Sequence, residues 1–195
     1  MKLIYEYWAK AGGLVGVCIL IVVYVKREDL DFITLLLWVQ AALLMFHQFE
    51  EYVFPGSFEH YFNEHIHRSN YLANSPLNQT SILTVNVFLG WTAYLLAPII
   101  VNSAVWFSSG IVIVTTLNGI LHTSMAIIKK RYNPGLATSL FLFIPFGLYM
   151  LNFLRDQLTG GEWILAVMTG IIGSAMIPVT IYMFRKKTCL NNEAG

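Results

Sequence analysis

Long apolar runs separated by short polar stretches cover most of the chain. Six of these runs approach or exceed the roughly 20 residues that a helix needs to cross a bilayer. They lie at about residues 7–25, 31–53, 80–101, 104–128, 136–154 and 162–184. The pattern predicts an all-α, polytopic membrane helix bundle that forms a single transmembrane domain over residues 1–195.

Composition agrees with a membrane setting. Hydrophobic residues make up 56% of the chain and charged residues 12%, whereas a soluble domain carries about a quarter of its residues as charged side chains. Lys2 and Lys10 precede the apolar stretch from Ala11 to Val25 as in a signal peptide, but KREDLD follows it in place of a small-residue cleavage site, so the segment is expected to be a helix. Cys18 and Cys189 show no ligand spacing. The net charge of +1 argues against a nucleic-acid partner.

Basic residues near the ends of the runs predict the orientation, because Lys and Arg are retained in the cytoplasm. With six spans, both termini share one side of the membrane, and the loop 54–79 lies on that side as well. The sequence therefore predicts a multi-pass protein of the inner (plasma) membrane with cytoplasmic termini. On the cytoplasmic side the prediction places Lys2, Lys10, Arg68, Lys129, Lys130, Arg131, Arg185, Lys186 and Lys187, and on the other side Lys26, Arg27 and Arg155.

Polar residues interrupt the second and fourth runs at similar depth. His47, Glu50 and Glu51 stand at i, i+3 and i+4, and Asn118 and His122 stand at i, i+4, so each set shares a helix face. His47 and His122 each lie about six residues, roughly 9 Å, inside the cytoplasmic end of their helix.

Asn86 enters the same layer from the third run. An ionisable group in a span costs about 2.5–3.5 kcal/mol on insertion scales, so such groups usually point into the bundle and mark a functional site. One polar cavity that opens toward the cytoplasm is therefore expected. The alternative is structural: a Glu near a helix end extends to the interface, and a lone His bonds to a backbone carbonyl.

Three short motifs carry a family resemblance: HQFEE at 47–51, NGILH at 118–122 and RYNPG at 131–135. Together they resemble a family of bacterial integral membrane proteins of unknown function named for its His-x-x-Glu-Glu signature, and the similarity runs from about residue 35 to 180. The resemblance implies no reaction, but it directs functional interest to specific positions. These positions are His47, Glu50, Glu51, Asn118, His122, Tyr132, Asn133, Pro134 and Gly135.

Two histidines and two carboxylates form a usual ligand set for a divalent metal, with zinc expected first and iron or manganese second. His47, His122 and one of Glu50 and Glu51 would bind the ion, and the other glutamate would act as a general base. Asn118 and Asn86 would orient a ligand or donate to a developing oxyanion.

The loop offers a second set of potential ligands in SFEHYFNEHIH, residues 57–67. A dinuclear site would draw on this set, His60 and Glu64 first. The alternative is a short amphipathic helix on the membrane surface, with a solvated polar face and with Phe58, Phe62 and Ile66 facing the lipid. The set comprises Glu59, His60, Glu64, His65 and His67.

Two other function classes remain open. A metal-free isomerase could use Glu and His as acid and base. A small transporter or proton relay could use the same residues, with Pro98, Pro145 and Pro178 breaking helices. No repeated halves are present, and the polar cluster lies toward one side of the membrane, whereas carriers usually bind near the midplane. Both features favour an enzyme.

The RYNPGL segment between the fourth and fifth runs contains a Pro-Gly turn. The turn could simply place Arg131 and its basic neighbours against anionic headgroups. In the functional alternative, Tyr132 and Asn133 cover the mouth of the cavity. The sequence as a whole predicts a metal-dependent membrane enzyme, a hydrolase or oxidoreductase, that acts on a lipid-like or amphipathic small molecule, with membrane lipids as its surroundings.

Overall fold

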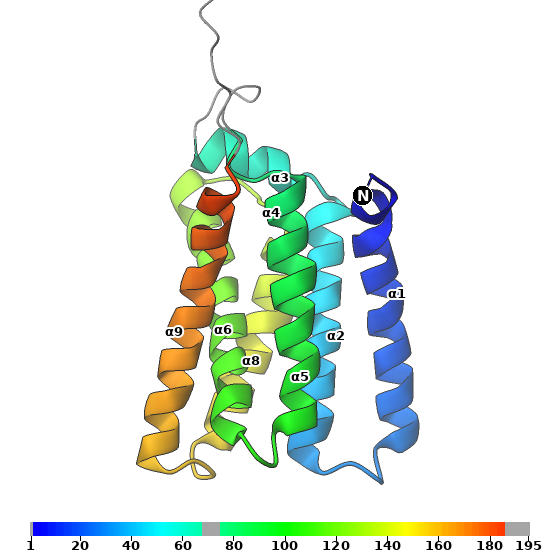
Figure 1. Ribbon diagram of the computed structural model, residues 1–195, viewed down its shortest axis with the longest axis vertical. Coiled ribbons are helices and arrows are strands. Elements are labelled where there is room, and N and C mark those ends of the chain that lie inside the picture. The colour runs from blue at the N-terminus through cyan, green and yellow to red at the C-terminus, as the bar shows by residue number, and fades with distance from the viewer. Residues whose placement is uncertain (1, 68–74, 186–195) are drawn as a thin grey trace, which may run out of the picture.

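Six long helices run side by side in the computed structural model, which describes residues 2–67 and 75–185 (Figure 1). Over these residues the structure is all-helical, and six helices are long and apolar enough to cross a membrane, as predicted. The elements are α1 (Lys2–Lys26), α2 (Phe32–Tyr52), α3 (Phe58–Tyr61), η1 (Phe62–Ile66), α4 (Gln79–Leu83), η2 (Thr84–Trp91), α5 (Thr92–Ile100), α6 (Val105–Lys129), α7 (Leu136–Thr138), η3 (Ser139–Phe143), α8 (Ile144–Leu154) and α9 (Gly160–Met183).

The third and fifth candidate spans are composite. The third joins α4, η2 and α5 into one helix over Gln79–Ile100, and the fifth joins α7, η3 and α8 over Leu136–Leu154. η2 and η3 are π-helical turns, which often occur at functional sites. Pro98 and Pro178 lie inside α5 and α9, and both helices continue through them, so neither proline breaks its span.

Polar caps begin the helices where the apolar runs start. The Asp31 carboxylate accepts hydrogen bonds from the backbone N–H and the hydroxyl of Thr34, and these bonds hold the pKa of Asp31 below its usual value. Asn78 begins α4, and Thr159 begins α9, each with a reciprocal capping box. These caps satisfy backbone donors that the following helix leaves unpaired.

Small residues bring the helices close together. A Cβ atom added to Gly110 of α6 would meet Thr169 of α9, and one added to Gly16 of α1 would lie 3.3 Å from the backbone oxygen of Ala42 in α2. Gly147 of α8 lies against α6 in the same way. Small residues at such crossings let the helices approach closely, so that van der Waals packing holds them together in lipid, where the hydrophobic effect between helices is absent.

The first residues of α1 and the end of α9 lie at the same end of the bundle, and α3 lies across that end (Figure 1). We call it the α3 end. Its assignment to the cytoplasm remains a prediction. Arg68, Lys186, Lys187 and Cys189, which entered the sequence analysis, lie outside the described residues.

The loop 54–79 contains the predicted short helix, as α3 and η1, but its apolar face was assigned wrongly to the lipid. Phe58 is buried, Phe62 lines an internal cavity and Ile66 packs against the core. The reason is that this helix lies across the end of the bundle (Figure 1), where its apolar side chains pack against residues of the long helices.

Candidate functional site

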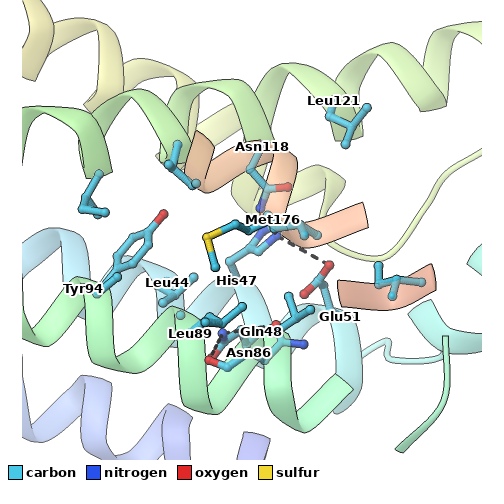
Figure 2. Close-up of a pocket in the computed structure, with 18 of the residues that line it drawn as sticks. Leu44, His47, Gln48, Glu51, Asn86, Leu89, Tyr94, Asn118, Leu121 and Met176 are labelled. Atoms are coloured by element: carbon cyan, nitrogen blue, oxygen red, sulfur yellow. Dashed lines mark hydrogen bonds and ion pairs between the residues drawn. The ribbon is translucent and has the colours of Figure 1, made fainter. Parts of the chain in front are cut away.

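A cavity of about 450 Å³ lies between α2, the third span, α6 and α9. Its size is that of a small-molecule site. Figure 2 shows Tyr94 and Glu51 toward opposite ends of this cavity, with His47 between them. Most of the lining is apolar, and its histidine and glutamate side chains, His47, Glu51 and His122, lie on the α3 side of Tyr94.

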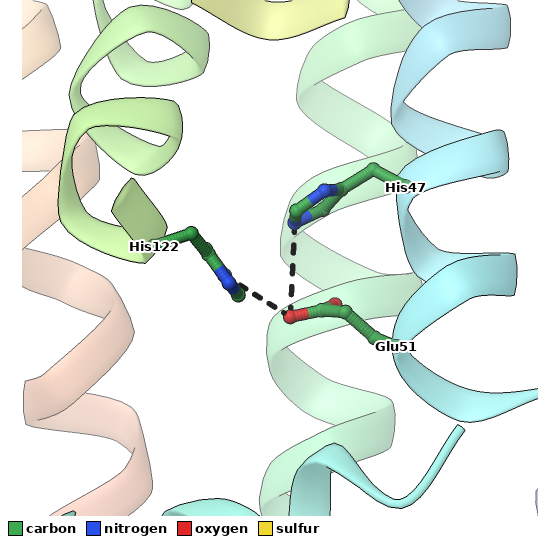
Figure 3. Close-up of side chains that lie close together, drawn as sticks. All are labelled: His47, Glu51 and His122. Carbon is green, nitrogen blue, oxygen red and sulfur yellow. Dashed lines mark ion pairs between the residues drawn. The ribbon is translucent and has the colours of Figure 1, made fainter. Parts of the chain in front are cut away.

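His47, Glu51 and His122 converge at that end (Figure 3). The Glu51 Oε1 atom lies 3.7 Å from His47 Nε2 and 3.4 Å from His122 Nε2, and one ligand atom from each residue falls within 4.8 Å of the others. All three side chains are buried, with the two histidines 1% and 2% exposed. The two imidazole rings meet edge to face at 4.8 Å. Because α2 supplies two of the groups and α6 the third, the site depends on the packing of these helices.

Thr138 determines which nitrogen of His47 carries the proton. The single hydroxyl proton of Thr138 is donated to Glu50 Oε2 at 2.5 Å, since a carboxylate only accepts. His47 Nδ1 lies 2.7 Å from the same hydroxyl and must therefore donate to it. The remaining nitrogen, Nε2, keeps its lone pair, which lies 3.7 Å from Glu51 Oε1 and accepts a hydrogen bond from Asn118 Nδ2 at 3.3 Å.

Asn133 does the same for His122. The Asn133 amide donates from Nδ2 to the backbone oxygen of His122 at 2.9 Å, which turns its Oδ1 toward the ring. His122 Nδ1 lies 2.6 Å from this Oδ1 and must donate to it. Both imidazoles thus present an Nε2 lone pair to the same carboxylate oxygen, as expected for metal-binding histidines whose other nitrogen is hydrogen-bonded.

Glu50 points away from this cluster, toward the start of the fifth span. Its Oε1 accepts from the Tyr132 hydroxyl at 2.6 Å and from Ala137 N at 2.9 Å, and its Oε2 accepts from Thr138 N at 2.7 Å and from the Thr138 hydroxyl. Burial, and the hydrogen bond to Glu50, raise the pKa of Tyr132 well above its usual value, so the phenol donates. A carboxylate has about four acceptor positions, and here all four are taken. These four bonds hold Glu50 away from the three clustered ligand atoms, so of the two glutamates that the sequence offered as ligands the structure favours Glu51.

Gly135 completes the contact between the third motif and the two histidines. Its φ is +97°, and a Cβ atom there would lie 2.7 Å from His122 Cε1 and 2.8 Å from His47 Cε1. Only glycine combines this backbone conformation with so close an approach. The YNPG turn therefore contacts both imidazoles directly, and Tyr132 and Asn133 act as partners of Glu50 and His122.

The two asparagines occupy different surroundings. Asn118 Nδ2 lies 3.3 Å from His47 Nε2, at the edge of the cluster. Asn86 lines the same cavity, but its Oδ1 accepts from Gln48 and its Nδ2 donates to Tyr52 and to a backbone oxygen of its own helix. Asn118 is thus placed to contact a substrate at the cluster, whereas Asn86 is held by a neighbouring polar network.

The histidines and glutamates of α3 and η1 do not join the buried cluster. His60 and Glu64 form an ion pair of 2.7 Å with side chains 57% and 50% exposed. Among the described residues, the one group of three or more potential metal ligands is His47, Glu51 and His122. The remaining histidines and glutamates of the loop have separate partners. Glu59 accepts from the Tyr5 hydroxyl, His65 accepts from Arg131, and His67 contacts the Tyr182 hydroxyl. His60 of α3 and Glu64 of η1 are exposed and lie apart from the buried cluster, so the dinuclear site stays a prediction that the cluster does not support.

Two contacts of the site escaped sequence reasoning. Thr138 follows the RYNPG motif by three residues and links Glu50 to His47. Phe143 lies with its ring 4.4 Å from that of His47 and is fully buried. A threonine and a phenylalanine in an apolar run give no chemical signal, so only the spacing from the Pro-Gly turn could have drawn attention to Thr138.

The three ligand atoms, which lie within 4.8 Å of one another, could hold a metal ion. Tetrahedral zinc with bonds of about 2.0–2.1 Å separates neighbouring ligand atoms by about 3.3 Å. The two distances to Glu51 Oε1, 3.4 and 3.7 Å, are close to that edge. Two neutral imidazoles with one carboxylate is a known ligand set of catalytic zinc.

Over the described residues, the fold is that of a multi-pass membrane helix bundle, and the site is a buried His/Glu cluster in contact with the RYNPG turn. A family model described as "Protein of unknown function with HXXEE motif" matches residues 38–150, more than half of the chain. The chain belongs to this family, as the three motifs indicated. No curated protein and no solved structure matches it.

Proposed function

We propose that this chain is a multi-pass enzyme of the plasma membrane that holds a divalent metal ion at His47, Glu51 and His122 and acts on the polar part of a lipid-like molecule. The observation that carries the proposal is the convergence of two oriented Nε2 lone pairs and one carboxylate oxygen at the end of an apolar cavity. Three acceptors buried together repel one another, even with the Asn118 amide facing the His47 lone pair, and a cation would relieve that repulsion.

Zinc is the first expectation for the ion, with iron or manganese second. Such an ion, when bound, supplies Lewis-acid activation of water or of a carbonyl group. Glu50 contributes through Thr138, because it keeps the His47 lone pair directed into the site. Asn118 can donate from its amide to an oxygen on which negative charge develops, a role that suits hydrolysis of an ester or amide.

One observation favours a second candidate. Glu51 lies between the two imidazoles at near hydrogen-bonding distance, an arrangement that also suits proton transfer without a metal. A metal-free acid–base isomerase would use the same three side chains. A transporter is less well supported, because the polar cluster lies about six residues from the ends of α2 and α6 at the α3 end of the bundle, whereas carriers usually bind near the membrane midplane.

Elemental analysis by plasma mass spectrometry distinguishes these candidates. The samples are detergent-purified wild type, His122→Ala and the matched control His60→Ala, whose histidine is exposed and lies outside the cluster. We expect near-stoichiometric metal in the wild type and in His60→Ala, and its loss in His122→Ala. Absence of metal from all samples after re-addition of zinc, iron and manganese would refute the metal centre and leave the acid–base candidate.

A further inference from the structure

We propose that the cavity holds one hydrocarbon chain of an amphiphile that enters sideways from the bilayer, with its polar head at the His47–Glu51–His122 cluster and its tail toward Phe107. The position of the head rests on the proposed function. The position of the tail rests on the cavity alone.

The length of the cavity suits an extended chain. His122 and Phe107 both line it, and fifteen residues of α6 separate them. At 1.5 Å per residue the distance along the helix is about 22 Å. One leaflet contributes about half of the roughly 30 Å hydrocarbon core, so a chain of ordinary membrane length fits within the cavity.

The chemistry of the wall changes along this length. Beyond the cluster the wall is formed by side chains such as Leu44, Leu89, Ala93, Ile111 and Val114. The hydroxyl of Tyr94 at the deep end is bonded to Thr115 and is therefore already partnered. A ligand with one polar end and one long apolar end matches this distribution, because its tail desolvates only apolar surface.

Three side chains that line the cavity also have much exposed surface, which supports a lateral opening toward the lipid. Leu121 of α6 and Ile172 and Met176 of α9 line the cavity, yet they are 56%, 55% and 43% exposed. All three lie well inside candidate spans, so their exposed surface is at the depth of acyl chains. Because α6 and α9 pack closely through Gly110 and Gly170, a chain from the bilayer would pass these side chains on the side of α9 that faces the third span, without crossing water. Membrane lipid is therefore the proposed source of the ligand.

Photo-crosslinking tests this placement directly. Purified protein in lipid nanodiscs is illuminated with a long-chain fatty acid that carries a diazirine at its tail end, and the labelled peptides are identified by mass spectrometry. A short-chain fatty acid with the same group is the second probe. We expect the long probe to label the deep wall near Phe107 and Ile111, and the short probe to label residues nearer the cluster.

A variant that shortens the cavity provides the second measurement. Ala93 lines the cavity on α5, about 10 Å beyond Asn86 along the third span, so Ala93→Phe fills its deep half. Ile99→Phe is the matched control, because Ile99 lies on the same helix, is 67% exposed and does not line the cavity. We expect Ala93→Phe to reduce labelling of the deep wall by the long probe at least tenfold, to leave the short probe unaffected and to retain the metal, while the control behaves as wild type.

Label that is confined to outer faces of the bundle, or deep label that survives Ala93→Phe, would overturn the proposal. If Ala93→Phe does not fold, the wild-type label map decides alone. Bound metal without labelling of the deep wall would refute the hydrocarbon-chain site and leave the metal centre intact. Labelling of the deep wall without bound metal would support the hydrocarbon-chain site and refute the metal centre.

Discussion

Thr138→Val tests whether the site depends on an oriented imidazole. Valine has nearly the same shape but lacks the hydroxyl that donates to Glu50 and accepts from His47. The change leaves the His47 N–H, which is 1% exposed, without a partner, and an unpaired buried donor costs about 1–3 kcal/mol. The ring can recover that energy by turning over or changing tautomer, but either change removes the Nε2 lone pair from the cluster.

We expect the affinity for zinc to fall 10–100-fold, the usual effect of losing a partner behind a metal-binding histidine. This corresponds to about 1.4–2.8 kcal/mol of binding free energy. The assay is competition for zinc against a chromophoric chelator in detergent solution.

Thr138→Ser keeps the hydroxyl and should restore most of the affinity. Thr123→Val is the control for loss of a hydroxyl elsewhere in the bundle, because the Thr123 hydroxyl bonds only to the backbone oxygen of Gly119 among the described residues. Wild-type affinity in Thr138→Val would refute the reasoning, since the hydroxyl would then have no influence on the cluster.

Four further substitutions separate the roles of the motifs. Gly135→Ala should abolish metal binding, because it adds a Cβ atom 2.7–2.8 Å from both imidazoles at a φ of +97°, while Gly161→Ala, which meets nothing within 4 Å, should bind metal normally in the same elemental analysis. Asn133→Ala should lower zinc affinity 10–100-fold in the chelator assay by freeing the ring that it orients, and unchanged affinity would contradict that role. In Glu50→Gln the new amide N–H group faces the four donors that bind the carboxylate, so the free energy of unfolding should fall by about 2 kcal/mol in denaturant titrations with chelator present. Glu51→Gln should lose the metal but keep the wild-type free energy of unfolding under the same conditions. Equal losses of stability in the two glutamine variants would contradict the division between the glutamates.

The predicted spans agree with the structure to within a few residues, because length and apolar composition alone decide where a helix can cross a bilayer. Matching depth also placed His47 and His122 in one layer correctly, since depth follows from residue count along straight helices. The direction of the loop helix was wrong for a related reason. Periodicity reports that Phe58, Phe62 and Ile66 share a face, but it does not report what that face meets.

The two glutamates of the HQFEE motif show where spacing stops being informative. At 100° per residue, Glu51 lies about 40° from His47 around the helix on one side, and Glu50 lies about 60° from it on the other. Both count as neighbours of His47 in sequence. In the folded bundle one side of α2 faces α6 and the cavity, and the other faces the start of the fifth span. Only tertiary packing distinguishes a carboxylate that meets His122 from one that caps a helix.

The RYNPG turn shows why the three motifs occur together. A surface turn would need only a residue that permits its backbone conformation, and Gly135 at φ +97° meets that need alone. The structure adds three requirements that a simple turn lacks: an amide at Asn133 to orient His122, a phenol at Tyr132 to hold Glu50, and no side chain where both imidazoles approach. Each requirement is met by a residue of the turn, and each acts on a residue of the other two motifs. The turn is therefore part of the site. Its residue types are those needed to orient the two buried imidazoles and to leave space for them.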